Sequence, residues 1–433
     1  MGVTWSDASD RFVGAWKDGL GFFVYPTKRF KTVTIHAAWV RDLSVQDRAL
    51  GATLVQVLRR GTQSWPNRML MQARLEHLYG ASFRADVAKL GDKQLLSFHV
   101  NVANGQFLAN NPDTVTEALD FLTEVLDRPH MESGIFPEHV VEQEKAQVKR
   151  QISAIINDKG QYAMSRLMEL VADGERFGLK KLGTMEEVDQ ITAPALTNYY
   201  NATRSQSPFV FTVVGDVDPD AVYRHFSKRW NRARQPMTTI APYRGRHDGQ
   251  TVIEARDVQQ GKLHLAYRTG LIATSDQYPA LLMYSGILGG FSHSKLFINV
   301  REKASLAYYA YSRCDPALAL MTIGAGIEFS DYDAARRIIE EQVEDMRRGR
   351  FSDEEMAFTL KAYVNDILSE EDSPGQLIGR HVEHLLIGGG AYGPDLVTAL
   401  NKVRREDVVR VGHDIELDTI YFLTAEGDAE HDK

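Results

Sequence analysis

The stretch that decides the fold runs from Gly289 to Tyr308 and reads GGFSHSKLFINVREKASLAY. Its paired glycines are typical of a helix end. A loop and a second helix carrying Arg301 are expected next, and Tyr308 follows Arg301 by seven residues. If this helix continues, that spacing places the guanidinium and the phenol on one face, where they could bind a carbonyl or a carboxylate. Without further information, an Arg–Tyr pair that is only a surface feature explains the spacing as well.

The order of elements around this stretch matches an order near the start of the chain. Runs of β-branched and aromatic residues predict strands, and apolar residues at helical spacing predict helices. The predicted elements are strands at 20–25 and 32–40 and a helix at about 45–60 in the first half, and a strand at 262–268 and a helix at about 276–288 in the second. Gly61 and Gly289 end the two helices and lie 228 residues apart, as do His36 and His264. An internal duplication is the simplest interpretation.

Longer amphipathic helices and a closing strand complete each half. They are predicted at 112–126, 137–157 and 209–214 in the first half, and at 332–348, 353–369 and 419–423 in the second. Residues 231–250 are rich in Arg, Pro and Gly and have no apolar period, which is typical of a linker. We therefore predict an α+β protein with an N-terminal domain at 1–230, a linker at 231–250 and a C-terminal domain at 251–433. Each domain is expected to be an antiparallel sheet backed by helices.

The composition is that of a globular protein long enough for two domains. The chain has 433 residues, of which 43% are hydrophobic and 25% charged, and a formal charge of -8 argues against nucleic-acid binding. Its single cysteine, Cys314, rules out an internal disulfide and suits a small apolar core position. Neither a secretory signal nor a run of about 18 apolar residues is evident. We expect a cytoplasmic protein with no membrane segment and no nucleic-acid partner.

Histidine arrangements that could hold a metal are scarce in this chain. A zinc hydrolase helix needs two histidines three or four residues apart and a glutamate that activates water, and neither HExxH nor HxxEH occurs. Glu76–His77 supplies only half of the inverted motif. His381 and His384 lie three residues apart, but helical periodicity turns Glu383 away from their common face. A surface helix that ends at the glycines 388–390 is therefore simpler than a metal site there.

The stretch from Gly289 to Tyr308 resembles the second-domain signature of the pitrilysin/insulinase family of zinc peptidases. That signature is a GG-x-S-x-LF run followed by R-E-K-x-x-L-A-Y, and the resemblance covers essentially the whole chain. It implies two αβ domains of the LuxS/mitochondrial-processing-peptidase-like metallohydrolase fold. It also implies that Arg301 and Tyr308 contact the peptide substrate.

The first half departs from this family where zinc would bind. Active members carry H-x-x-E-H shortly before a Gly–Thr pair, and Gly61–Thr62 keeps that pair. The resemblance places the two histidines at Ala52 and Gln56, the catalytic glutamate at Val55, and a further glutamate ligand at Gln151, seven residues after Glu144. Methyl, isopropyl and amide groups cannot form this zinc site or activate water. We therefore expect a degenerate metal site, with no catalytic residue and no cofactor in this chain.

Additional residues around 104–112 and 131–136 resemble the bacterial YmfF-like branch of the family. That branch is described as elongation factor P aminopentanol-modification-associated, which reports an association and implies no such activity here. Its members commonly occur beside an active homologue. The resemblance thus implies a non-catalytic subunit of a heterodimer whose zinc-bearing partner cleaves peptides with Arg301 and Tyr308 supplied in trans. The alternatives are a peptide-binding or scaffold homodimer, and a metalloenzyme with a relocated site at His381 and His384.

Overall fold

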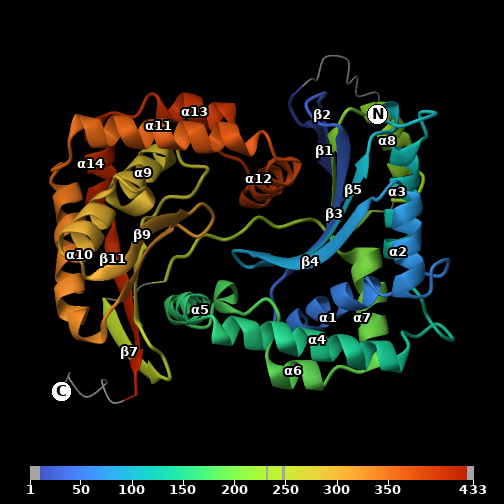
Figure 1. The fold of residues 1–433 in the computed structure, drawn as a ribbon, viewed down its shortest axis with the longest axis horizontal. Helices are drawn as coiled ribbons and strands as arrows, with labels where there is room; N and C mark the ends of the chain where they lie inside the picture. Colours follow the sequence, from blue (N-terminus) through green and yellow to red (C-terminus); the bar gives the residue numbers. More distant parts are fainter. Residues whose placement is uncertain (1–9, 231–232, 246–248, 427–433) are drawn as a thin grey trace. The chain divides into compact units, whose positions relative to one another are not determined.

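The computed structural model describes residues 10–230, 233–245 and 249–426 (Figure 1). Its strands are β1 (Val13–Lys17), β2 (Leu20–Pro26), β3 (Thr32–Asp42), β4 (Ser82–Leu90), β5 (Lys93–Ala103), β6 (Phe209–Gly215), β7 (Gln250–Arg256), β8 (Gly261–Arg268), β9 (Ala307–Asp315), β10 (Leu320–Ile327) and β11 (Glu416–Ala425). Its α-helices are α1 (Arg48–Leu58), α2 (Arg68–His77), α3 (Thr114–Asp127), α4 (Glu138–Asn157), α5 (Lys159–Ala172), α6 (Met185–Asp189), α7 (Ala193–Gln206), α8 (Pro219–Ser227), α9 (Tyr278–Ser285), α10 (Tyr332–Arg347), α11 (Asp353–Glu370), α12 (Pro374–Ile387), α13 (Pro394–Leu400) and α14 (Arg405–His413). Within these ranges no helix has the length and apolar character needed to cross a bilayer.

The first sheet contains six strands in the order β1-β2-β6-β3-β5-β4. Strands β2 and β6 run parallel, and every other neighbouring pair in this sheet is antiparallel. Helices α1, α3 and α8 pack on one face of the sheet (Figure 1). The central strand β3 is buried at every position from Val33 to Val40. Because successive side chains of a strand point to opposite faces, both faces of the sheet are covered along β3.

The second sheet repeats this plan with five strands in the order β7-β11-β8-β10-β9. Strands β7 and β11 are parallel and the other neighbours antiparallel, so the pairing matches that of β2-β6-β3-β5-β4. His36 on β3 and His264 on β8 therefore occupy equivalent central strands. The predicted α+β fold and the duplication are confirmed, and each largely antiparallel sheet also includes one parallel pair. In each unit the last strand, β6 or β11, is reached through helices and runs parallel to an early strand, β2 or β7.

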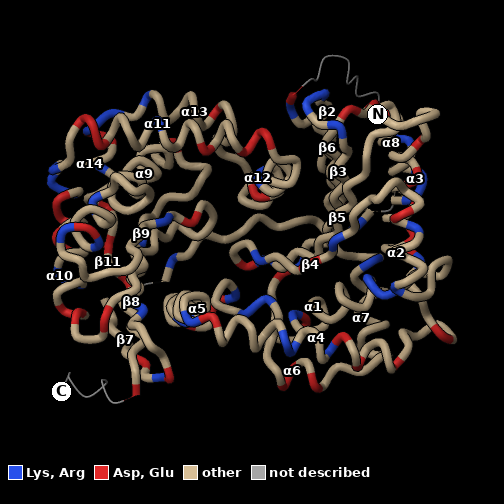
Figure 2. The backbone as a smooth tube through the Cα atoms, viewed as in Figure 1, with Lys and Arg blue, Asp and Glu red and all other residues tan. Residues whose placement is uncertain are grey.

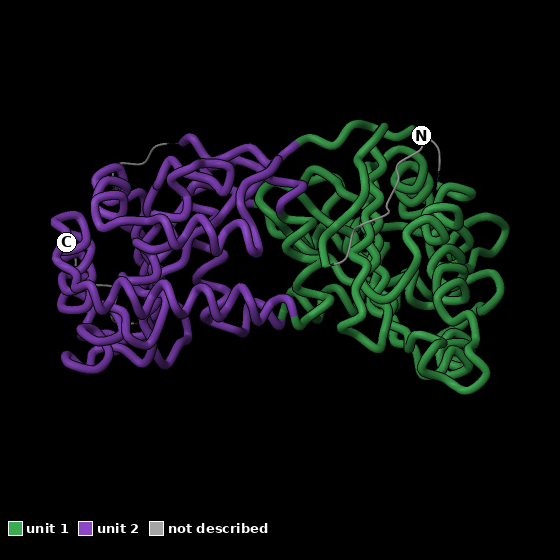
Figure 3. Tube along the Cα trace, turned by 90° about the horizontal axis from the view of Figure 1, so that it is seen from above, with its two compact units in different colours: residues 1–153, 179–238, 372–383 green, residues 154–178, 239–371, 384–433 purple. Residues whose placement is uncertain are grey.

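The chain divides into two compact units that are not continuous in sequence (Figure 3). Unit 1 comprises residues 1–153, 179–238 and 372–383, and unit 2 comprises residues 154–178, 239–371 and 384–433. Helix α5 thus belongs to unit 2, although it lies in the first half of the sequence. Most of α12 belongs to unit 1, although it lies in the second half. The boundaries predicted at residues 230 and 251 follow the duplication in the sequence and stay a prediction.

Helix α5 is anchored in unit 2 by one carboxylate, that of Glu254 on β7. Glu254 Oε1 accepts hydrogen bonds from the Tyr162 hydroxyl and from Arg256 Nε, both at 2.6 Å. Its Oε2 accepts from Arg166 Nε at 3.1 Å and from the Tyr421 hydroxyl at 3.0 Å. Burial by itself raises the pKa of Glu254, but these donors outweigh burial and lower the pKa to about 2. The carboxylate therefore stays ionised and links α5 to both β7 and β11.

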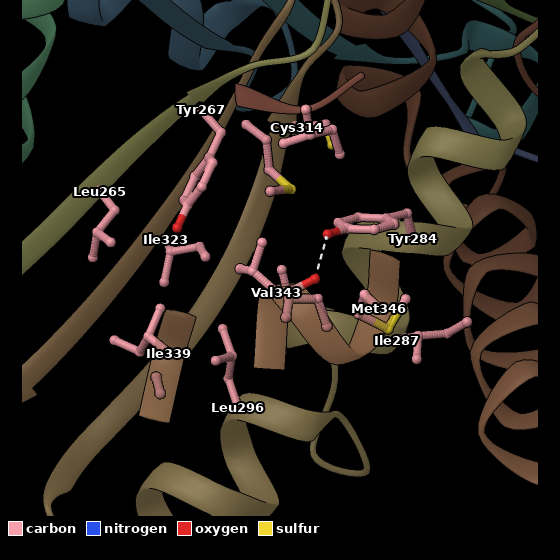
Figure 4. Packing of buried hydrophobic residues seen from close by; sticks show 14 of the residues in the cluster. Leu265, Tyr267, Tyr284, Ile287, Leu296, Cys314, Ile323, Ile339, Val343 and Met346 are labelled. Carbon is pink, nitrogen blue, oxygen red and sulfur yellow. Dashed lines mark hydrogen bonds between the residues drawn. The ribbon is translucent and has the colours of Figure 1, made fainter. Parts of the chain in front are cut away.

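The main core of unit 2 lies on the other face of its sheet from α5. Glu254 and Tyr421 alternate along their strands with Ile253 and Phe422, which contact the core, so the two sets point to opposite faces. Figure 4 shows part of this core, including Leu265, Tyr267, Tyr284, Ile287, Leu296, Cys314, Ile323, Ile339, Val343 and Met346. The Tyr284 hydroxyl donates to the Val343 carbonyl oxygen at 3.3 Å. Burial raises the pKa of Cys314 to about 12, as suits an unreactive core thiol.

Helix α12 is attached to unit 1 through an aromatic contact. The His381 ring stacks on Phe12, with ring centroids 3.9 Å apart, and meets the edge of Phe23 at 4.6 Å. Phe23 follows Phe22, whose ring packs instead against Phe226 of α8. Because successive strand residues point to opposite faces, α12 and α8 cover opposite faces of the first sheet.

Candidate functional site

The segment to which the resemblance assigns the zinc ligands forms helix α1, and its interior positions are filled by core side chains. Ala52 and Val55 are 1% and 0% exposed, and Gln56 is 6% exposed. The helix packs against α6, α7, β4 and β5. Its first residue, Arg48, is tied to Glu187 of α6 by two hydrogen bonds of 2.9 and 2.6 Å. These residues make α1 a packed structural helix.

The Gly–Thr pair after α1 is required by the local backbone rather than by a metal. A Cβ on Gly61 would lie 2.6 Å from the carbonyl carbon and oxygen of Pro66, a distance that forces the chain to move. Thr62 is fully buried and exchanges two hydrogen bonds with Trp65. This explains how the pair can persist after the metal ligands are gone.

Glu144 of α4 is buried and forms an ion pair rather than facing a metal. Its Oε1 lies 3.4 Å from Nε of Arg60, which follows α1. Burial raises the pKa of Glu144, and the nearby guanidinium groups of Arg60, Arg59, Arg150 and Arg68 oppose that rise. Of the two alternatives for this position, an ion pair or solvent exposure, the structure shows the ion pair.

The described ranges contain no group of three or more His, Cys, Asp or Glu side chains arranged to hold a metal ion. Ala52, Val55, Gln56 and Gln151 therefore do not fit the zinc of an active peptidase. The relocated site is not supported either, because His381 stacks on Phe12 while the His384 ring lies 4.4 Å from that of Tyr392.

Glu76–His77 and the glycines 388–390 lie at the ends of helices. Glu76 and His77 are exposed at the end of α2. Gly388, Gly389 and Gly390 all have positive φ, and the amides of Gly388 and Gly389 donate to the His384 carbonyl oxygen. The prediction that these glycines terminate the helix is confirmed, since such a backbone closes a helix C-terminus.

Arg301 lies in a short π-helical segment, η4 (Phe297–Lys303), and its side chain reaches the surface. Its guanidinium carbon sits 4.5 Å from the centre of the Phe297 ring, and its Nε lies 3.7 Å from Glu302 Oε1. The ring contact orients the guanidinium. An exposed ion pair of this length contributes little energy, so Arg301 remains able to bind another group.

The helix does not continue to Tyr308, so the condition for placing Arg301 and Tyr308 on one helix face is not met. The chain turns at Ser305, which has a positive φ of 55°, and enters strand β9. Along β9 and β10, Ala307 pairs with Ile327 and Tyr309 pairs with Gly326. Tyr308 is thus the extra residue of a β-bulge, and its side chain is 81% exposed. Bulges commonly redirect a side chain in this way, often beside a functional site.

The two glycines that open the signature have different roles. Gly289 belongs to a π-helical turn, η3 (Gly286–Gly290), that extends α9. A Cβ on Gly289 would lie 2.4 Å from the backbone nitrogen of Ser312 on β9, whereas a Cβ on Gly290 would meet nothing nearer than 3.6 Å. Only the first glycine is needed for the close approach of helix and strand. This approach fixes β9, the strand that presents Tyr308.

Sequence reasoning overlooked the arginines near the positions to which the resemblance assigns the metal ligands. The signal was present as the Arg59–Arg60 dipeptide directly before Gly61, and as Arg150 directly before Gln151. The search for metal ligands considered only His, Glu and Cys, so these arginines were not considered as binding groups.

A comparison with protein families matches residues 190–363 to the peptidase M16 inactive domain. The Bacillus subtilis protein YmfF, whose name describes an inactive metalloprotease, is 34% identical over 407 residues, which is 94% of this chain and 96% of YmfF. The chain therefore belongs to the M16 family of pitrilysin/insulinase-type peptidases, in its inactive YmfF-like branch.

Solved structures agree with this fold. A conserved protein from Enterococcus faecalis V583 superposes with a TM-score of 0.87 at 28% identity, covering 96% of this chain and 99% of its own. The peptidase M16 inactive domain protein from Pseudomonas fluorescens gives a TM-score of 0.77 at 15% identity, with 96% and 98% coverage.

Proposed function

We propose that this chain is the non-catalytic subunit of an M16 peptidase, pairing with a zinc-bearing homologue and supplying Arg301 and Tyr308 to the peptide in trans. The observation that carries the proposal is a contrast between two regions. The metal positions Ala52 and Val55 are buried and packed, whereas Tyr308 is raised on a bulge and 81% exposed. A cytoplasmic setting is part of the proposal.

The stability of the fold does not explain why the Tyr308 ring is exposed. A tyrosine ring left in water gains none of the free energy that burial would provide, and the positive φ of Ser305 carries a strain of about 1 kcal/mol or more. A peptide that covered the ring would recover the lost apolar contact. This supports a binding role for the bulge.

The chemistry of the pair suits an extended peptide. The Arg301 guanidinium donates in a planar fork to carbonyl or carboxylate oxygens, and the Tyr308 hydroxyl can donate or accept. A guanidinium and a phenol of this kind suit binding and orientation of a peptide rather than activation of water. In this proposal the partner contributes the zinc and its activated water, while this chain orients the substrate.

The test is to co-express the chain with a zinc-bearing homologue from the same organism and to measure assembly and peptide cleavage separately. Arg301→Ala and Tyr308→Phe are expected to lower kcat/KM by about 10- to 100-fold, the effect of losing a hydrogen bond that involves a charged group, without changing the mass of the complex. Arg313→Ala is the matched control, because Arg313 is also exposed and lies on β9. Unchanged turnover in an assembled complex would refute the role of the pair.

A peptide-binding or scaffold homodimer is the second candidate, favoured by the same exposed pair. The chain purified alone distinguishes the two functions by its mass and by peptide binding. A stable homodimer that binds peptides through Arg301, and forms no complex with the homologue, would support the scaffold function.

A further inference from the structure

The degenerate metal site carries an excess of positive charge that folding does not neutralise. The charges of four arginines, Arg59, Arg60, Arg68 and Arg150, act on the buried carboxylate of Glu144. Only Arg60 forms a salt bridge with it, at 3.4 Å. Within the described residues, no salt bridge involves Arg59, Arg68 or Arg150. Figure 2 marks the basic positions along α1 and α4 in blue.

Three of these guanidinium groups are held by neutral amides. Arg59 Nη1 donates to Gln56 Oε1 at 3.2 Å, and Arg60 Nη2 donates to Gln143 Oε1 at 2.5 Å. Nε and Nη2 of Arg150 donate to Gln147 Oε1 at 3.1 and 2.6 Å. An amide oxygen fixes the direction of a guanidinium but leaves its charge uncompensated. Arg59 and Arg150 are therefore oriented without being neutralised, and Arg60 shares its charge with Glu144.

Ordinary salt bridges occur elsewhere in the same unit. Arg48 is paired with Glu187, and Arg74 with Glu117 at 2.9 Å. The whole chain carries a formal charge of -8, so carboxylates are not in short supply. A local group of four arginines with one glutamate is thus a departure from the rest of the molecule, at the place where active relatives would hold a cation.

We propose that this group, formed by Arg59, Arg60 and Arg150 with Arg68 at its edge, binds an oxyanion, either the terminal carboxylate of a peptide or a phosphate. Guanidinium forks match the planar geometry of both anions and form charge-assisted hydrogen bonds with them. Arg59 and Arg60 are half-buried and Arg68 and Arg150 are exposed, so salt weakens the binding. The site belongs to this chain alone and does not depend on a zinc-bearing partner.

The proposal is tested on the full chain purified alone, by calorimetric titration at low ionic strength. The probes are inorganic phosphate, an N-acetylated dipeptide with a free carboxylate, and the same dipeptide with a C-terminal amide. Phosphate or the free-carboxylate peptide is expected to bind, and the amide is not. Binding of the peptide alone identifies a peptide terminus as the source of the anion, and binding of phosphate alone identifies a free phosphate.

Substitutions test whether the arginine group is responsible for binding the anion. Arg59→Gln and Arg150→Gln are each expected to weaken binding by about tenfold, the loss of one charge-assisted contact. Arg313→Gln, the same charge change at an exposed position of unit 2, is expected to leave it unchanged. Glu144→Gln removes the one counter-charge and is expected to tighten binding, an effect that a purely structural role does not predict. The proposal is overturned if neither anion binds, or if Arg313→Gln weakens binding as much as Arg59→Gln.

Discussion

Replacing Glu254 by glutamine should weaken the attachment of α5 to its sheet and lower the free energy of unfolding by an amount that depends on pH. In the folded protein the donors Tyr162, Arg256, Arg166 and Tyr421 converge on this carboxylate and lower its pKa from 4.5 to about 2. One pKa unit corresponds to about 1.4 kcal/mol, so the full shift corresponds to about 3.4 kcal/mol. The side chain is 20% exposed, and solvent screening reduces this to roughly 2–3 kcal/mol.

The sign follows from the direction of the shift. A carboxylate whose pKa is lowered by folding stabilises the protein above its unfolded pKa, near 4.5, and this contribution is lost as the pH falls toward 2. Glu254→Gln should therefore lower the free energy of unfolding by roughly 2–3 kcal/mol at neutral pH. At about pH 3 the difference between wild type and variant should shrink by more than half.

Urea denaturation followed by circular dichroism at both pH values measures this difference. Glu416→Gln is the control, since Glu416 pairs with Arg268 on the same sheet but its side chain is 59% exposed, where an ion pair contributes less than about 1 kcal/mol. An equal loss at both pH values would show that Glu254 acts by packing and not by charge. A loss at neutral pH no larger than that of the control would refute the anchoring role.

Further variants test the packing of the signature regions by the same denaturation measurement. Gly289→Ala places a methyl group 2.4 Å from Ser312 nitrogen and should cost about 1–3 kcal/mol, whereas Gly290→Ala should be close to neutral. Val55→Glu restores the residue type of an active peptidase but buries an unpaired carboxylate, and should destabilise the chain by about 3 kcal/mol or more without producing peptide cleavage. Thr184→Ala removes the capping box of α6 and should cost about 1 kcal/mol.

Local patterns were sufficient for most elements, because hydrophobic periodicity and helix-ending glycines act over a few residues. The duplication was visible for the same reason, since Gly61 and Gly289 both close a helix that follows a central strand. The geometry of Arg301 and Tyr308 was not predictable in this way. Whether the chain continues as a helix after Lys303 or turns into β9 depends on pairing with β10, which lies later in the sequence.

Local sequence patterns also could not predict that α5 belongs to unit 2 and most of α12 to unit 1. The periodicity of α5 shows an apolar face but not which sheet receives it. In the fold α5 packs on β8 and β11, and its Tyr162 bonds Glu254, which is 92 residues away along the chain. The arginines at the lost metal site were missed for a different reason, because a search for ligands of a cation passes over groups that bind anions.

The residues that match the family signature fall into two physical classes, and the division bears on function. Gly61 and Gly289 are fixed by backbone contacts that no side chain could replace, so folding alone accounts for them. Tyr308 contributes no such contact, because it is an extra residue of a bulge and lies in solvent. A chain that needed only the fold could lose this tyrosine at little cost in stability. The exposure of Tyr308, seven residues after the exposed Arg301, therefore supports the proposed binding at this surface.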